Sequence, residues 1–64
     1  MDTKNLEERK DEICQKFNVT RDRFDKCFDF LMQDFPSEIS AVDYLESQIK
    51  MLYYGAANKL PGEE

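Results

Sequence analysis

The sequence contains no histidine and no tryptophan among its 64 residues. Histidine is the commonest general base and a common metal ligand, because its ordinary pKa lies near neutrality. A chain this short also buries only about 60% of the surface that its unfolded form exposes, which leaves little room for a concave site. We therefore expect a protein that is not an enzyme, with no catalytic residue, no metal site, no cofactor and no small-molecule substrate.

Cysteine is scarce, and long apolar runs are missing. The two cysteines, Cys14 and Cys27, form no Cys-x-x-Cys pair, and no signal-peptide pattern precedes them. Such cysteines are typical of reduced, buried thiols, so we expect a cytoplasmic protein. No run of about 18 apolar residues occurs, so we expect no membrane span.

Acidic residues outnumber basic residues in this sequence. Nine Lys and Arg stand against fourteen Asp and Glu, which gives a formal net charge of -5. The field around such a protein repels phosphate backbones and anionic lipids. With 36% charged and 41% hydrophobic residues, the composition is that of a folded domain and not of a disordered acidic tail. A protein is therefore the favoured partner, and nucleic acid is the less favoured one.

Helical periodicity predicts three helices and no strand. The first runs from about residue 5 to 17 and starts with a capping box of Asn5 and Glu8. Asn18 tolerates the left-handed conformation that ends a helix, and Thr20 can cap the next one. The expected inward face of this first helix consists of Leu6, Ile13, Cys14 and Phe17.

The second and third helices meet at a break set by Pro36, with Ser37 as the cap of the third. Gly55 is expected to fray or end the third helix. The expected inward stripes are Phe24, Cys27, Phe28, Leu31 and Phe35 in the second helix, and Ile39, Val42, Leu45, Ile49, Leu52 and Ala56 in the third. The prediction is an all-α three-helix bundle, with a single helical domain over 1–58 and a flexible tail over 59–64.

The segment "ICQKFNVTRDRFDKCF" resembles the helix-turn-helix signature. The resemblance rests on an apolar-then-small pair, a turn residue, a capping hydroxyl and inward apolar anchors: Ile13, Cys14, Asn18, Val19, Thr20, Phe24 and Phe28. A small residue lets two helices cross closely, and the hydroxyl caps the second helix. The resemblance implies one alternative function, a dimeric DNA-binding regulator. Its DNA contacts would be Thr20, Arg21, Arg23 and Lys26.

The outer positions of that second helix do not carry a basic excess. Three basic and three acidic residues alternate there and cancel in charge: Arg21, Asp22, Arg23, Asp25, Lys26 and Asp29. A helix that reads DNA normally keeps a surplus of positive charge on this face. The pattern therefore indicates the helix pair more strongly than it indicates DNA binding.

Two further resemblances imply different functions. The stretch "EISAVDYLESQI" is similar to the third helix of ubiquitin-associated modules, which implies a ubiquitin-associated-like binding module, although Phe17-Asn18-Val19 replaces that family's Met-Gly-Phe loop. The stretch "RFDKCFDFL" and the Ala-Asn-Lys-Leu-Pro ending resemble the small acidic transcription coactivators of T-even-type bacteriophages. That resemblance implies a helical protein that binds RNA polymerase and does not bind DNA.

Aromatic and methionine residues exceed what one bundle core needs. Phe30 lies off the stripe of the second helix, so this ring is either covered by another segment or exposed as a binding anchor. The same surplus marks the outer side of the third helix, a composition enriched at interfaces. The expected protein-binding residues are Phe30, Met32, Tyr44, Met51 and Tyr54.

The sequence therefore predicts a small acidic regulatory protein that works through protein contacts, with the transcription machinery as the expected target. Self-association is a further expectation, since burying the tyrosine-rich surface of the third helix would add to a thin core. It stays open whether some of these rings instead complete the core of the monomer.

Overall fold

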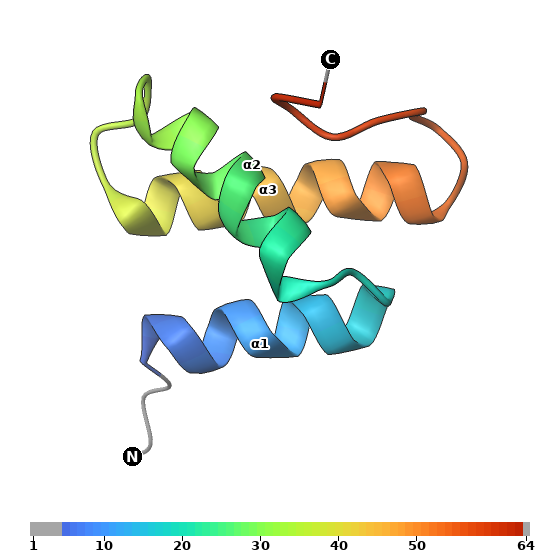
Figure 1. Cartoon of the computed structure of the whole chain (residues 1–64), viewed down its shortest axis with the longest axis horizontal. Coiled ribbons are helices and arrows are strands. Elements are labelled where there is room, and N and C mark those ends of the chain that lie inside the picture. Colours follow the sequence, from blue (N-terminus) through green and yellow to red (C-terminus); the bar gives the residue numbers. More distant parts are fainter. Residues whose placement is uncertain (1–4, 64) are drawn as a thin grey trace.

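The computed structural model describes residues 5–63 and contains three helices in this part of the chain, with no strand between them. The helices are α1 (Leu6–Phe17), α2 (Arg21–Met32) and α3 (Glu38–Tyr53). All three pairs of helices are in contact, so the predicted all-α three-helix bundle is confirmed. Figure 1 shows α2 crossing in front of α3, with α1 alongside.

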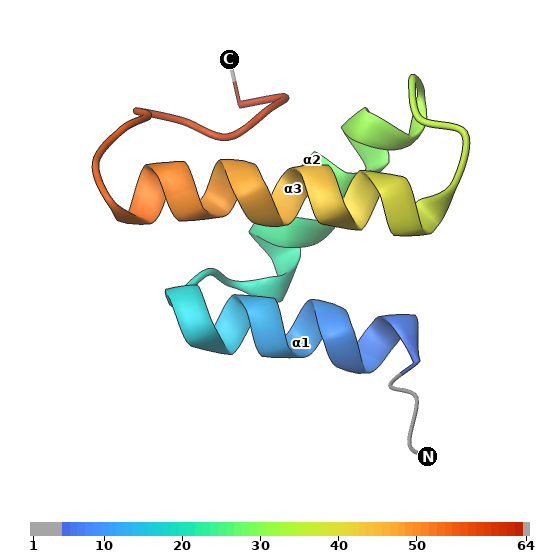
Figure 2. The ribbon, with the colours of Figure 1, turned by 180° about the vertical axis from the view of Figure 1, so that it is seen from behind.

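α1 and α3 run side by side in the same direction, and α2 packs across them (Figures 1 and 2). Two contacts fix this parallel pairing. Arg9 near the start of α1 pairs with Asp43 and Glu46 near the start of α3. At the other end, the Phe17 ring meets the Tyr53 ring edge-on, with 5.4 Å between centroids.

Each helix begins at a polar cap that the sequence predicts. Asn5 Oδ1 accepts from the Glu8 N–H at 2.8 Å, and Glu8 Oε1 accepts from the Asn5 N–H at 3.2 Å, which completes the capping box. Thr20 and Ser37 cap α2 and α3 in the same way, each accepting from the N–H three residues on. Asn18 ends α1 in the left-handed conformation, with φ 58° and ψ 48°.

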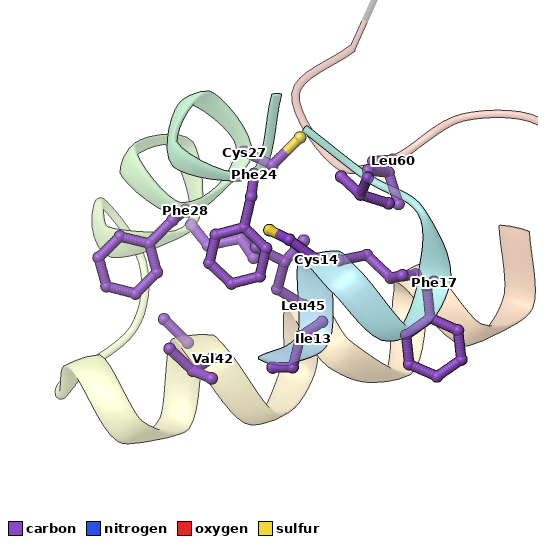
Figure 3. Close-up of a cluster of buried hydrophobic side chains, with 13 residues drawn as sticks. Ile13, Cys14, Phe17, Phe24, Cys27, Phe28, Val42, Leu45 and Leu60 are labelled. Carbon is purple, nitrogen blue, oxygen red and sulfur yellow. The ribbon is translucent and has the colours of Figure 1, made fainter. Parts of the chain in front are cut away.

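The core lies between the helices and is built on the predicted stripes (Figure 3). Phe24 is completely buried at its centre, and its ring stacks on the Phe28 ring with 6.5 Å between centroids. Both cysteines are buried and free, as predicted. The buried apolar residues are Ile13, Cys14, Phe17, Val19, Phe24, Cys27, Phe28, Leu31, Ala41, Val42, Leu45, Ile49 and Leu60.

Three predicted inward positions are placed differently. α2 ends at Met32, so Phe35 lies beyond it and is only half-buried. Ile39 is 62% exposed and lies in the first turn of α3, at the end of the bundle. Ala56 falls outside α3, which ends at Tyr53 before Gly55 adopts a φ of 85°.

The C-terminal segment, residues 56–63, folds back onto the bundle. Figures 1 and 2 show it running back along α3 on the side opposite α1. Leu60 is 3% exposed within the core cluster, and Glu63 pairs with Arg23 of α2. The packing of residues 59–63 differs from the flexible tail expected over 59–64, because an apolar anchor and a carboxylate both find partners on the bundle.

Candidate protein-binding surfaces

The residues expected to touch DNA are all used within the fold. Thr20 Oγ1 caps α2 by accepting from the Arg23 N–H at 3.2 Å. Lys26 Nζ lies 3.4 Å from the Asp22 carboxylate one turn earlier on α2. Both side chains of that pair are about four-fifths exposed, at 79% and 81%, so the pair is freely solvated.

Arg21 joins α1 to α2 through three carboxylates. Its guanidinium lies 3.1 Å from Glu7 and 3.0 Å from Asp25, and it also donates to Asp11. These bonds raise the pKa of Arg21, with Asp11 as the largest cause. The hydrogen bond from Arg21 in turn lowers the pKa of Glu7. Both terminal nitrogens of the Arg21 guanidinium therefore donate within the molecule, whereas its buried Nε has no hydrogen-bond partner among residues 5–63.

Arg23 holds the C-terminal segment by a two-pronged ion pair. Arg23 Nε donates to Glu63 Oε2 at 2.6 Å, and Nη2 donates to Oε1 at 2.9 Å. The Leu60 N–H donates to the same Oε1 at 2.9 Å. Arg23 first and Leu60 second lower the pKa of Glu63 to about 2. No local pattern in the sequence reveals this pair, because its members are 40 positions apart.

A buried lysine is the second feature that sequence reasoning missed. Lys10 is 6% exposed, and its Nζ sits 4.0 Å from the centroid of the Phe28 ring. Glu7 approaches the same ammonium at 3.4 Å. The aliphatic part of Lys10 packs over the core, and its ammonium lies against the Phe28 ring and the Glu7 carboxylate. Lys10 therefore contributes to the packing of the bundle.

The end of α2, the connection to α3 and the start of α3 carry carboxylates without cations. Within residues 5–63, Asp29, Asp34 and Glu38 are exposed and form no ion pair. The last turn of α2 contains no basic residue to offset the negative end of the helix. The negative potential in this part of the described chain is therefore uncompensated.

Phe30 is both partly covered and partly exposed. Its ring is 44% exposed, and a Cβ built on Gly62 would come within 2.9 Å of its Cγ. The C-terminal segment thus covers one side of the ring and leaves the rest open. Met32 is half-buried and packs against the core, so of these two α2 residues only Phe30 presents a large apolar surface.

One stripe on the exposed side of α3 carries no charged residue. Tyr44 and Met51, seven positions apart, are 42% and 43% exposed, and Tyr44 rests on the Phe35 ring at 5.2 Å. Tyr54 follows the end of the helix and is 73% exposed, and its ring and the Tyr53 ring meet edge to face. At helical spacing the stripe consists of Ser40, Tyr44, Ser47, Gln48 and Met51.

The link between α1 and α2 points its apolar residues inward. Phe17 is 5% and Val19 is 9% exposed, and only Asn18 between them faces solvent. The alternative of a ubiquitin-associated-like binding module expects contacts from the loop at this place. Here the loop offers no exposed apolar side chain.

Two kinds of site are absent from the described residues. No group of three or more potential metal ligands among Cys, Asp and Glu comes together in residues 5–63. Over the same residues, none of the helices has the length and apolar character needed to cross a membrane.

Comparisons with known proteins found no relative. No protein-family model, no curated protein and no solved structure matches this chain.

Proposed function

We propose that this chain is a small acidic regulatory protein that acts by binding another protein and does not catalyse a reaction. The observation that carries the proposal is the distribution of charge on α2. Arg21 and Arg23 form ion pairs within the molecule and Lys26 lies beside Asp22 in a solvated pair, whereas Asp29 and Asp34 form no ion pair within residues 5–63. Such a surface repels a phosphate backbone and attracts a basic protein surface.

Phe30 supplies the apolar part of this partner surface. It adjoins Asp29 in the sequence and is 44% exposed, a combination suited to a ring that anchors in a basic, apolar partner. The resemblance to helix-turn-helix regulators and to phage coactivators points to a component of the transcription machinery as that partner. The surplus of free carboxylates supports a coactivator-like role over DNA reading.

The test is a capture experiment with matched charge variants. The immobilised full chain is exposed to a lysate of its source cells, beside a chain carrying Asp29→Asn and Asp34→Asn and a control carrying Asp22→Asn. We expect a captured protein that is lost with the double variant and with rising salt but is kept by the control, because Asp22 is already paired with Lys26. Equal capture by all three chains would contradict the proposal.

A gel-shift titration with DNA at low and moderate salt tests the DNA-binding function. We expect no shift, because the basic groups of α2 are already paired. Binding that weakens steeply with salt would instead support the DNA-binding regulator and overturn the proposal.

Self-association is a second candidate, and the uncharged stripe on α3 favours it. Two copies of a chain with net charge -5 repel each other, and that repulsion is smallest where the contact surface carries no charge. Tyr44 and Met51 lie on such a stripe. Light scattering on a sizing column should show a dimer that Tyr44→Ser with Met51→Ser abolishes and Lys50→Ser preserves. A wild-type monomer at high concentration would remove this candidate.

A further inference from the structure

The C-terminal segment is held on the bundle by a few contacts that lie close together in the sequence. Leu60 buries its side chain in the core cluster, where Figure 3 shows it turned inward from the segment. Three residues later, Glu63 forms the two-pronged pair with Arg23. Between them Gly62 packs on the Phe30 ring. Four consecutive residues therefore carry the contacts that anchor the segment to α2.

A turn in the backbone aims these two side chains at α2. The Glu63 N–H donates to the Leu60 carbonyl at 3.1 Å, and the Leu60 N–H donates to Glu63 Oε1 at 2.9 Å. Gly62 closes the turn with a φ of 86°, a conformation that favours glycine. A Cβ at that position would stand 2.9 Å from Phe30 Cγ and 3.0 Å from Phe30 Cβ. The motif thus requires a leucine, a glycine and a carboxylate in fixed order.

The polar part of the attachment is weak, so the buried Leu60 side chain is its main anchor. The pair of Arg23 and Glu63 is open to solvent, with side chains 41% and 28% exposed, and ion pairs in such positions contribute little to stability. Between α3 and Leu60, Gly55, Ala56, Asn58 and Lys59 are exposed and Ala57 is half-buried. The Ala56 and Ala57 N–H groups donate to the Met51 carbonyl at 2.7 and 3.2 Å, so backbone hydrogen bonds hold the first residues of this lead at the end of α3.

We propose that the position of Leu60, together with Arg23 and Phe30 of α2, is a binding site for a short segment of a partner protein. The partner segment carries a leucine, a glycine two residues later and a carboxylate three residues later, as residues 60–63 do. In the free protein the chain's own C-terminal segment occupies this site. The inference rests on the proposed function, because it names the chemistry of one contact that a protein partner would make.

Displacement would uncover the part of α2 that the segment shields. Phe30 would lose the cover of Gly62. Cys27 is 2% exposed, and the charges of Glu63 and Arg23 act on its thiol. Displacement would remove the segment that carries Glu63 from beside this thiol. The chain's own segment competes for the site at an effective concentration of about a millimolar. A partner must therefore make contacts that this segment does not make, and the uncovered Phe30 ring is a surface for them.

The test measures binding of a probe peptide to the full chain. The probe is a fluorescein-labelled peptide with the sequence of residues 58–64, Asn-Lys-Leu-Pro-Gly-Glu-Glu, and binding is followed by fluorescence anisotropy. The chain carrying Gly62→Ala is compared with wild type and with a Gly55→Ala control. Both glycines have nearly the same φ, 85° and 86°, but only Gly62 has a neighbour that a methyl group would strike.

We expect the Gly62→Ala chain to bind the probe about tenfold more tightly than wild type, since its own segment competes less well. The Gly55→Ala chain should bind as wild type does. Adding Arg23→Gln to Gly62→Ala should weaken binding, and replacing the leucine of the probe by serine should abolish it. Equal, absent or leucine-independent binding in the Gly62→Ala chain would overturn the inference.

A second variant guards against misreading a folding defect. Leu60→Ser also empties the site, and its helix content is checked by far-UV circular dichroism. Loss of the helices in both the Gly62→Ala and Leu60→Ser chains would overturn the inference, because the segment would then be an integral part of the core. The peptide assay uses no native partner, so its failure is separate from failure of the capture experiment with the Asp29 and Asp34 variants.

Discussion

Arg21 of α2 donates a hydrogen bond to Asp11 of α1 and so connects these two helices. Glu7 and Asp25 lie on the same guanidinium at 3.1 and 3.0 Å. Three carboxylates therefore surround one cation at the contact between α1 and α2.

Removal of Arg21 should therefore affect stability, whereas removal of Lys26 should not. Arg21→Ala leaves three carboxylates near one another without their cation, and we expect the free energy of unfolding to fall by about 1 to 2 kcal/mol. Lys26→Ala breaks only a solvated pair with Asp22 and should change it by less than about 0.5 kcal/mol. Urea unfolding followed by circular dichroism measures both values, and equal losses would contradict this account of Arg21.

The end of α1 offers a second test, at Asn18. Its φ of 58° and ψ of 48° place it in the left-handed region, where a Cβ without a polar side chain is disfavoured. Asn18→Ala should lower the free energy of unfolding by about 1 kcal/mol, whereas Asn18→Gly should leave it unchanged or raise it slightly. The comparison is made by urea unfolding. An alanine variant as stable as the glycine variant would show that the link does not require this conformation.

The parts of the fold that the sequence predicted are those that local chemistry decides. Asn5, Thr20 and Ser37 cap helices through N–H groups three residues away, and the stripe around Phe24 follows helical spacing. These signals need no knowledge of distant residues. The C-terminal segment could not be predicted in this way, because its position depends on Arg23, which is 40 residues from Glu63.

The residue types of the candidate site could be predicted from the sequence, but their exposure and their ion pairs could not. Helical spacing separates Phe30 from the core stripe, yet only the fold shows that Gly62 covers part of its ring. Likewise, alternating charges on α2 indicated a neutral surface. In the structure, Arg21 pairs with Asp11 of α1 and Arg23 pairs with Glu63 of the C-terminal segment. Asp29 on α2 is left without a cation among the described residues.

The attachment of the C-terminal segment should depend on pH below the physiological range. The folded-state pKa of Glu63 is lowered from 4.5 to about 2 by Arg23 and by the Leu60 N–H. A depressed carboxyl pKa contributes stability that is complete above pH 4.5 and is lost as the pH falls toward 2. Carbon-13 NMR of the Glu63 carboxyl should report this low pKa. The Glu63→Gln chain should lack the corresponding shift of the Leu60 amide signal, and a Glu63 pKa near 4.5 would contradict the pairing.

Cys27 provides a chemical readout of the same segment, with Cys14 as the internal control. Burial raises the pKa of both thiols, so both should react slowly with iodoacetamide in the folded wild type. The thiol of Cys27 feels the charge of Glu63, and Figure 3 shows Cys27 and Leu60 at the same border of the core cluster. Cys14 instead lies against the Thr20 carbonyl, 3.9 Å from its sulfur.

Leu60→Ser should therefore speed alkylation of Cys27 several-fold and leave that of Cys14 unchanged, as measured by mass spectrometry of the digested protein. Local release of the segment exposes only the thiol that it shields, whereas global unfolding exposes both. Equal acceleration of the two cysteines would indicate that Leu60 supports the whole bundle. No acceleration of either would mean that Cys27 is shielded by the helices alone, and that the segment can leave without opening this part of α2.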